Sequence, residues 1–295
     1  MKILILGVSG MLGHTLFRQF SEKQDYIVFG TVRSISKVGR LLSTELQEQI
    51  INCVDAINVD SIINAIRIAK PDVIINCIGI IKQLDISNDP LIVIPINSLF
   101  PHRLANICAV CNSRLIHIST DCVFNGKKGN YSEDDPSDAD DLYGKTKFLG
   151  EIQYDHCVTI RTSIIGHELN TRFGLVEWFL SQKSKVKGYD KAFFTGFPTI
   201  ELANIIHKFV IPNQTIHGLY NVSSNKISKY ELLKLIADRY SKQIEIEKDD
   251  SIVIDRSLNS SRFRKLTGYI PPSWNDLVNM MYIDQQKRKG KETTR

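Results

Sequence analysis

Short apolar runs alternate with amphipathic stretches through the first half of the chain. The apolar runs predict strands at 2–6, 26–31, 51–55, 72–77, 114–118 and 157–161. Between them, apolar residues recur three and four positions apart and predict helices near 11–22, 43–50, 59–69, 96–111 and 143–153. This alternation predicts an α/β fold with a parallel sheet that is wound on both faces. Ligands bind such sheets beyond the carboxyl ends of the strands.

The pattern changes after Gly166, where strand-like and helix-like stretches are mixed. We expect a first domain over 1–165 and a smaller lobe over 166–286, some segments of which return to the first domain. Ser228 precedes a helix-like stretch and is expected to cap it. The basic run 287–291 and Arg295 predict a solvated tail over 287–295.

A glycine-rich loop follows the first predicted strand. Its residues are Gly7-Val-Ser9-Gly10-Met11-Leu12-Gly13. Gly7 permits a tight turn, Gly10 lets the backbone approach a pyrophosphate, and Gly13 lets the helix pack close to the sheet. The loop therefore predicts a dinucleotide-binding domain. On its own it suits a plain strand-to-helix connection equally well.

The end of the second predicted strand favours NADPH as the cofactor, with NADH as the alternative. An NAD-binding domain usually has an Asp or Glu at this place, whereas Arg33 and Ser34 follow the strand here. A guanidinium and a hydroxyl suit a 2′-phosphate, and Lys37 and Arg40 add positive charge nearby. A solvated basic loop would have the same composition.

A hydroxyl-rich triplet and a tyrosine motif supply the candidate chemistry. Ser119-Thr120-Asp121 closes the strand at 114–118, and Tyr143-Gly-Lys-Thr-Lys147 opens a predicted helix. Residues four apart share one helix face, so Lys147 can reach Tyr143 or a ligand that lies across both. An ammonium group favours the phenolate and lowers the pKa of a tyrosine from about 10. A Ser or Thr hydroxyl at the end of this strand would orient a carbonyl that Tyr143 protonates, which is the chemistry of a ketoreductase.

The tyrosine motif needs this context. Tyr230-Glu-Leu-Leu-Lys234 has the same spacing, but no hydroxyl-capped strand precedes it, and it is interpreted as an ordinary amphipathic pattern. Asn76, Cys77 and Gly79 end the fourth strand and are expected to pass beside the cofactor, although Gly79 also suits a simple turn. The complete expected cofactor contacts are Gly7, Ser9, Gly10, Met11, Leu12, Arg33, Ser34, Asn76, Cys77, Gly79, Tyr143 and Lys147.

Composition narrows the class of protein. The 295 residues are 43% hydrophobic, enough to bury a sizeable core, and the net charge of +5 is modest. No basic stripe interleaves with aromatic residues, which argues against nucleic acid as a partner. We expect no membrane span and no signal peptide, and therefore a cytoplasmic protein.

Cysteine and histidine spacing predicts no metal site. Of six cysteines, only Cys108 and Cys111 have a metal-like or redox-like spacing, and no second Cys or His pair accompanies them. Buried free thiols are the expected state.

These motifs together resemble the extended short-chain dehydrogenases/reductases, and within them the dTDP-4-dehydrorhamnose reductase group. The resemblance spans nearly the whole chain and rests on Gly7–Gly13, Pro71–Asn76, His117–Asp121, Tyr143–Lys147, Ile160–Ser163, Gly196–Thr199, Gly218–Val222, Arg256–Asn259 and Pro272–Trp274. It implies a Rossmann-like fold, a nucleotide-diphosphate sugar as substrate and a homodimer. It also implies that Thr120, Tyr143 and Lys147 are catalytic and that Lys147 holds the nicotinamide ribose.

Six residues are candidates for the sugar-nucleotide site: Lys82, Asp121, Arg161, Asn170, Thr199 and Arg256. Asp121 would bind a sugar hydroxyl or satisfy backbone donors at the strand end. For Arg161 and Arg256, diphosphate binding and surface ion pairing are equally compatible with the sequence. Asn170 lies in a polar loop after a strand, and Thr199 closes a predicted rigid turn.

Two departures from the rhamnose enzymes refine the expected substrate. Bulky residues at Ile80 and Ile81, followed by Lys82, replace a small Ala-rich segment and suggest a different hexose, such as a UDP-linked 2-acetamido-2,6-dideoxy-hexos-4-ulose. Asp121 is followed by Cys122, where related dehydratases place a second carboxylate. Dehydration is therefore not expected.

We expect NADPH-dependent reduction of the C4 ketone of a nucleotide-linked 4-keto-6-deoxyhexose, in the synthesis of surface polysaccharide such as the O-antigen of lipopolysaccharide. A nucleotide-sugar epimerase, or a bifunctional epimerase-reductase, would use the same fold and tyrosine. A regulatory subunit that resembles this group, as the methionine adenosyltransferase β subunit does, is the non-catalytic alternative.

Overall fold

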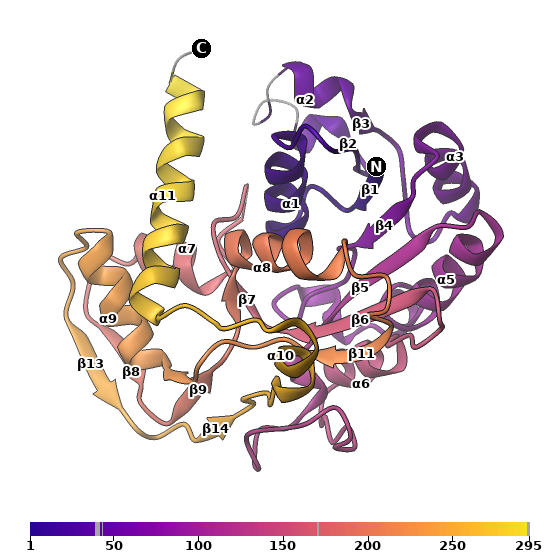
Figure 1. Cartoon of the computed structure of the whole chain (residues 1–295). Helices are drawn as coiled ribbons and strands as arrows, with labels where there is room; N and C mark the ends of the chain where they lie inside the picture. The colour runs from indigo at the N-terminus through magenta and orange to yellow at the C-terminus, as the bar shows by residue number, and fades with distance from the viewer. Residues whose placement is uncertain (39–41, 43, 170, 294–295) are drawn as a thin grey trace.

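The computed structural model describes residues 1–38, 42, 44–169 and 171–293. Within them, seven parallel strands form the main sheet in the order β11-β6-β5-β4-β1-β2-β3 (Figure 1). These strands are β1 Lys2–Leu6, β2 Ile27–Thr31, β3 Ile50–Ile51, β4 Val73–Asn76, β5 Arg114–Thr120, β6 Cys157–Thr162 and β11 Gly218–Asn221. The sheet is of the doubly wound kind that the sequence predicted, and its carboxyl edge is where a ligand site is expected.

Alternate side chains of β1 fill two cores on opposite faces of this sheet. Ile3 and Ile5 join the core that contains apolar residues of helices α1 and α8, whereas Leu4 and Leu6 join the core beneath α3 and α5. The helices are α1 Met11–Ser21, α2 Thr44–Glu48, α3 Val59–Ala69, α4 Pro90–Val93, α5 Phe100–Val110, α6 Leu142–Leu149, α7 Leu175–Ser181, α8 Thr199–Ile205, α9 Lys229–Arg239, α10 Ser261–Thr267 and α11 Trp274–Thr293. Burial on both faces explains why β1 is apolar throughout.

The long helical stretch before β5 begins earlier than the sequence predicted. It runs from Pro90 through a π-helical segment, Ile94–Leu99, into α5. The Asp89 side chain accepts from the Leu91 backbone N–H (2.9 Å), and Pro90 occupies the first turn, so the helix starts there. By length and composition Pro90–Val110 meets the criterion for a membrane span, which we had not expected, and half of its most apolar window is buried in the fold. Buried core helices meet the same criterion.

The C-terminal lobe is built from short strands and shares its core with the main sheet. Its strands are β7 Ile164–Ile165, β8 Val186–Tyr189, β9 Ala192–Phe194, β10 Phe197–Pro198, β12 Ile227–Ser228, β13 Ile246–Asp249 and β14 Ile254–Asp255. They form three small sheets, β10-β7, β12-β9-β14 and β13-β8. Apolar residues of α9 and α11 belong to the same buried cluster as Ile3 and Ile5, and α8 lies between the main sheet and this lobe (Figure 1). The two halves therefore depend on one core.

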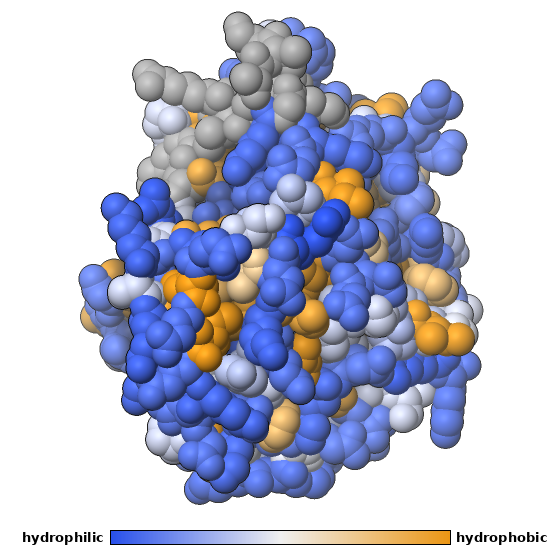
Figure 2. Space-filling view, turned by 90° about the vertical axis from the view of Figure 1, so that its left-hand side faces the viewer, coloured by the Kyte–Doolittle hydropathy of each residue, from blue (hydrophilic) through white to orange (hydrophobic). Residues whose placement is uncertain are grey.

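The basic tail expected over 287–295 is helical over its first seven residues, because α11 continues to Thr293. The helix is fixed to α1 by an ion pair between Arg18 and Asp284 (2.6 Å). Figure 2 shows the side of the molecule formed by this lobe, where hydrophilic side chains cover most of the surface and apolar side chains are visible in smaller groups.

Candidate active site

The glycine turn after β1 leaves an open helix N-terminus at the carboxyl edge of the sheet. Gly7 has a φ of +83°, and its N–H donates to the Thr31 hydroxyl (3.2 Å). A Cβ on Gly13 would lie 2.2 Å from the Gly7 carbonyl oxygen, so the helix packs against the turn only with glycine there. A Cβ on Gly10 would meet only that oxygen, at an ordinary 3.5 Å, and Ser9 and Gly10 are exposed. The protein thus leaves space beside Gly10 where an anion can approach the first turn of α1.

The residues that follow Gly10 contribute in different ways. Leu12 is buried in the core, so only its backbone faces the turn. His14 bonds the Gly10 carbonyl through Nδ1 (3.0 Å), and burial lowers the pKa of His14 to about 3, which keeps it neutral. Met11 lies against the segment before α7, because a Cβ on Gly174 would stand 2.7 Å from its terminal methyl.

The two strands beside β1 place the other expected cofactor residues. Arg33 is exposed after β2, and the Ser34 and Ser36 hydroxyls hydrogen-bond with each other (2.7 Å). Arg40, expected to add charge here, lies outside the described residues. Asn76 is engaged in structure: its Oδ1 accepts from the Ile78 N–H (3.1 Å), and its side-chain nitrogen lies 3.1 Å from His117 Nδ1.

Gly79 brings the segment after β4 close to Lys147. The glycine is exposed, and a Cβ there would stand 4.0 Å from Lys147 Nζ. Cys77 adjoins the same lysine, and burial raises the pKa of its thiol to about 12, so the thiol is neutral. The thiol therefore adds no charge beside Lys147.

Thr120 and Tyr143 meet at the end of β5. The Thr120 hydroxyl donates to Asp121 Oδ1 (3.2 Å) and accepts from the Cys122 N–H (3.1 Å). It lies close enough to the Tyr143 phenol to oppose the rise of the Tyr143 pKa. Tyr143 lies in the first turn of α6, where Asp141 caps the helix by accepting from the Gly144 N–H (2.7 Å). A Cβ on Gly144 would lie 2.2 Å from the Cys122 carbonyl oxygen, so a glycine after the tyrosine lets α6 approach the strand end this closely.

The electrostatics of the pair differ from the sequence-based expectation. Burial raises the pKa of Tyr143 above its usual value, with Cys122 and Asp121 acting in the same direction and the Thr120 hydrogen bond against them. Burial lowers the pKa of Lys147 to about 8, and its Nζ donates to the Ile118 carbonyl (2.8 Å). Lys147 is thus held beside β5. The sequence predicted that its ammonium lowers the pKa of Tyr143, whereas the Tyr143 pKa is raised.

Three expected substrate residues lie near the end of β5 and the start of α6. Asp121 is 8% exposed, and burial raises the pKa of its carboxyl while Arg256 opposes that rise. Arg256 Nε donates to the Phe124 carbonyl (2.7 Å), which anchors the guanidinium at the site. Lys82 is exposed and pairs with Asp141 (2.6 Å).

One residue at the site was missed. Lys229, the first residue of α9, is half-buried and also acts on the Asp121 carboxyl. It is 108 residues from Asp121 along the chain, so only the packing of the C-terminal lobe brings the two together. Its neighbour Ser228 caps α9 by accepting from the Glu231 N–H (3.2 Å), which confirms the expected cap.

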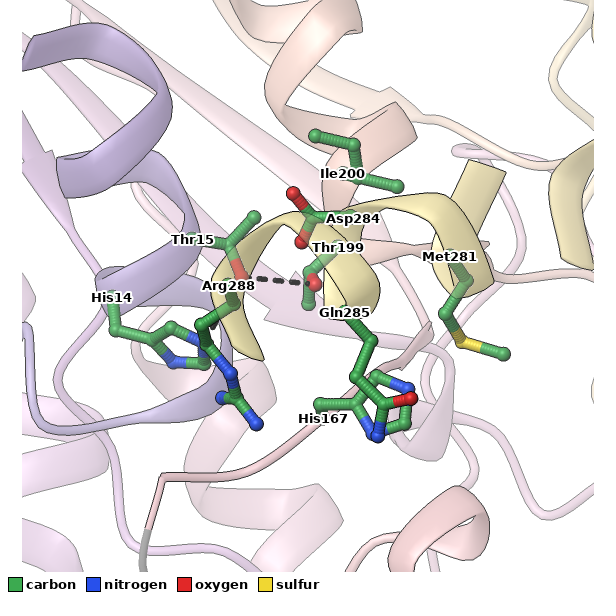
Figure 3. A pocket seen from close by; sticks show the side chains of 9 residues that line it. All are labelled: His14, Thr15, His167, Thr199, Ile200, Met281, Asp284, Gln285 and Arg288. Atoms are coloured by element: carbon green, nitrogen blue, oxygen red, sulfur yellow. Dashed lines mark hydrogen bonds between the residues drawn. The ribbon is translucent and has the colours of Figure 1, made fainter. Parts of the chain in front are cut away.

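Two expected substrate residues lie elsewhere, and a third is outside the described residues. Arg161 is 1% exposed and bound to Glu151, so it neither forms a surface ion pair nor faces a ligand. Thr199 accepts from the Thr15 hydroxyl (3.1 Å) between α8 and α1, in a polar cluster with His14 and His167 (Figure 3). Asn170 is not described.

That polar cluster surrounds a small cavity of ≈ 10 Å³. His167 joins it and bonds Glu177 (2.6 Å) and Tyr240 (2.8 Å), and Gln285 of α11 lies beside it (Figure 3). A larger pocket of ≈ 330 Å³ is lined on one side by Glu168, Leu169, Thr171 and Arg172, and on the other by Gln285, Arg288 and Lys289 of α11. Among the described residues, no group of three or more His, Cys, Asp or Glu side chains is arranged to hold a metal ion.

Comparison with known proteins agrees with this geometry. The family model described as the RmlD substrate binding domain matches residues 1–285. The methionine adenosyltransferase 2 subunit beta of Xenopus tropicalis is 26% identical, over 96% of this chain and 82% of that protein. The spore coat polysaccharide biosynthesis protein SpsK of Bacillus subtilis is 27% identical, over 80% of this chain and 78% of that protein.

Solved structures share the fold. A hypothetical dTDP-4-dehydrorhamnose reductase from Sulfolobus tokodaii superposes with a TM-score of 0.74 and 27% identity, over 93% of this chain and 98% of that one. The Bacillus anthracis dTDP-4-dehydrorhamnose reductase in complex with NADP superposes with a TM-score of 0.76 and 19% identity, over 96% of this chain and 98% of that one. Because the family model covers nearly the whole chain, this protein belongs to the RmlD substrate binding domain family.

Proposed function

We propose that this protein reduces the C4 ketone of a nucleotide-linked 4-keto-6-deoxyhexose with NADPH. The observation that carries the proposal is the contact between the Thr120 hydroxyl and the Tyr143 phenol at the carboxyl end of β5, with Lys147 one helical turn away. A sugar-nucleotide reductase needs a proton donor and a second hydroxyl at one carbonyl oxygen. The family relationship supports the same reaction class.

The chain's own residues would perform the proton chemistry. A carbonyl oxygen between Thr120 and Tyr143 would accept a hydrogen bond from each hydroxyl, and Tyr143 would donate its proton as the C4 alkoxide forms. The raised pKa of Tyr143 keeps this proton on the phenol at neutral pH until the alkoxide, a far stronger base, is present. Lys147 would stay charged below about pH 8 and bind a ribose hydroxyl.

The glycine turn fits a dinucleotide cofactor. The open space beside Gly10 and the exposed first turn of α1 suit a pyrophosphate, and exposed Arg33 suits a 2′-phosphate. NADPH would supply the hydride that the ketone receives, and NADH is the alternative. A relative of the same group is solved with NADP.

The substrate would be a nucleotide-diphosphate sugar, either dTDP-4-dehydrorhamnose or a UDP-linked 2-acetamido-2,6-dideoxy-hexos-4-ulose. Asp121 would bind a sugar hydroxyl, and Arg256 would contact the diphosphate through the side of its guanidinium opposite Nε. A cytoplasmic location, a homodimer and a part in surface polysaccharide synthesis, including O-antigen, belong to this proposal as predictions.

The test is to follow NADPH absorbance with purified protein and freshly generated 4-keto-6-deoxyhexoses. Four substrates separate the cases: dTDP- and UDP-linked sugars, each with and without a 2-acetamido group. Stoichiometric oxidation of NADPH with one of them is the expected result and identifies the substrate. Measured NADPH binding with no oxidation on any of the four would contradict the proposal.

A second candidate is a regulatory subunit. It is favoured by the 26% identity to methionine adenosyltransferase 2 subunit beta over 96% of this chain. This function predicts stable co-purification with a methionine adenosyltransferase catalytic subunit from the same source, and a change in that enzyme's rate. The reductase proposal predicts neither effect.

A further inference from the structure

A buried ion pair lies just beyond the end of α6, four residues after Lys147. The Glu151 side chain is 3% exposed and that of Arg161 is 2% exposed. Glu151 accepts from Arg161 Nε (2.8 Å) and from Nη2 (2.6 Å), in a two-point contact with β6. The Ser119 hydroxyl of β5 donates to the same carboxylate (2.7 Å). The position of the Glu151 charge is therefore fixed from two strands.

Lys147 and Glu151 contact consecutive residues of β5. Lys147 Nζ donates to the Ile118 carbonyl (2.8 Å), and Glu151 binds the next residue, Ser119. The two side chains thus bind neighbouring residues of one strand, and the carboxylate acts on the ammonium without a direct ion pair between them. Burial lowers the pKa of Lys147 to about 8, and the Glu151 carboxylate is the largest influence in the opposite direction.

The other titratable groups near Lys147 are neutral at physiological pH. Cys77, after β4, has a thiol whose pKa is raised to about 12 by burial. His117, within β5, has a pKa lowered well below its usual value by burial, with Lys147 acting in the same direction. Among the described residues, this leaves Glu151 as the charged group that stabilises the ammonium form of Lys147.

Stability alone does not account for this arrangement. Replacing a buried ion pair by apolar side chains of similar volume is often neutral or stabilising. Here Arg161 Nη1 has no hydrogen-bond partner in the described part of the chain, so the pair is not fully satisfied. Burying the Glu151 carboxylate costs desolvation free energy. This burial is explained if the charge of Glu151 acts on the nearby Lys147.

We propose that Glu151 is the counter-ion of Lys147, a positioning residue held in place by Arg161 and Ser119. Arg161 of β6 therefore influences Lys147 only by holding the Glu151 carboxylate in place, and it does not bind the substrate. The inference rests on the proposed function for the importance of a charged Lys147, although the effect of Glu151 on the Lys147 charge is measurable without any substrate.

The direct test is the titration of Lys147 in full-length protein labelled with [ε-13C]lysine. The Lys147 signal is assigned by its loss in Lys147→Arg. In Glu151→Gln, an amide keeps the size and the hydrogen-bonding positions but removes the charge, and we expect the Lys147 pKa to fall by about one unit. An unchanged Lys147 pKa in Glu151→Gln overturns the proposal.

Two further variants keep the result interpretable. Ser119→Ala removes a hydrogen bond to Glu151 but keeps the Glu151 charge. The Lys147 pKa should therefore stay within about 0.2 units of the wild-type value, which is small beside the variation of about one unit among lysines in proteins. If Glu151→Gln does not fold because Arg161 is left unpaired, the double variant Glu151→Gln/Arg161→Met removes both charges together. The Lys147 pKa should still fall there, but by less than in Glu151→Gln, because loss of the Arg161 charge acts in the opposite direction. A Lys147 pKa that stays at or above the wild-type value contradicts the proposal.

Kinetics connect this effect to the reaction. The alkaline fall of kcat/KM should move to lower pH in Glu151→Gln by the same amount as the Lys147 pKa, and should not move in Ser119→Ala. If the Lys147 pKa shifts but no nucleotide sugar is reduced by the wild-type protein, the proposed function fails and the counter-ion role stands. If the wild-type protein reduces a nucleotide sugar and the Lys147 pKa does not shift in Glu151→Gln, the counter-ion role fails and the proposed function stands.

Discussion

At the scale of single residues, the charge on Lys147 is the most sensitive feature of the site. Its folded-state pKa of about 8 lies below the usual value, because burial penalises the ammonium. The ammonium form is therefore complete well below pH 8 and is lost as the pH rises through 8. Activity that needs this charge should follow the same curve.

We therefore expect kcat/KM to be constant near neutral pH and to fall about tenfold for each pH unit above about pH 8. Lys147→Arg keeps the positive charge at all these pH values, since the guanidinium pKa exceeds about 12. Its residual activity should be lower, but it should lack this fall. An identical alkaline fall in Lys147→Arg would assign it to another group.

Residue chemistry was predictable from the sequence only where the partners are close in sequence or share a strand end. The sequence predicted that Thr120 closes a strand and that Tyr143 and Lys147 lie on the helix that follows, and the structure has them on β5 and α6. The partner of Arg161 was not predictable, since Glu151 reaches it only after α6, β5 and β6 have packed together. Lys229 was missed for the same reason.

At the scale of elements, the turn between β1 and α1 separates two roles of glycine. Gly13 is required by the protein itself, because a Cβ would stand 2.2 Å from the Gly7 carbonyl oxygen. Gly10 has no such conflict and is exposed. The sequence motif does not distinguish the two glycines, whereas the structure requires Gly13 for packing and leaves the space beside Gly10 open.

This difference predicts opposite effects of two alanine substitutions. Gly13→Ala should lower the free energy of unfolding by about 1–3 kcal/mol through overpacking. Gly10→Ala should change it by less than about 1 kcal/mol, an N-cap effect, and should weaken NADPH binding at least about tenfold. Urea denaturation and NADPH fluorescence titration measure the two quantities. Unchanged NADPH affinity in Gly10→Ala would separate the turn from the cofactor.

Element bounds followed the sequence where a local signal ends them. α3 matches its expected range of 59–69, because Asn58 caps its start and Lys70 takes a left-handed conformation after its end. The third strand ends at Ile51 instead of residue 55, because the chain turns at Cys53, which has a φ of +60°. The early start of the helix at Pro90 had a signal in Asp89-Pro90 that the periodicity alone did not include.

At the scale of the whole molecule, α11 joins the end of the chain to the cofactor domain. Asp284 pairs with Arg18 (2.6 Å) and accepts from Gln19 (3.1 Å), and both partners belong to α1. The two side chains of the ion pair are only 11% and 16% exposed. No pattern within 274–293 predicts this contact, because it depends on how α11 packs against α1, far away in the sequence. The place of β11 beside β6 in the main sheet also depends on packing between distant segments.

Asp284→Asn should therefore lower the free energy of unfolding by about 1–3 kcal/mol, because it leaves a half-buried guanidinium without its carboxylate. Asp250→Asn is the matched control, since the pair of Asp250 with Lys191 is exposed. It should cost less than about 1 kcal/mol. Equal losses in the two variants, measured by urea denaturation, would mean that α11 is not anchored through Asp284.

The central claim is that Tyr143 is the proton donor of a reductase, and the chain contains its own control in Tyr230. Tyr230 lies on α9, four residues before Lys234. The Lys234 Nζ lies 5.5 Å from the centroid of the Tyr230 ring. The decisive measurement is kcat with the identified sugar nucleotide, beside the dissociation constant of NADPH, in Tyr143→Phe and Tyr230→Phe. We predict that Tyr143→Phe lowers kcat by about 10²- to 10⁴-fold with NADPH affinity nearly unchanged, and that Tyr230→Phe alters neither. Turnover retained in Tyr143→Phe would remove Tyr143 from the acid role and contradict the account.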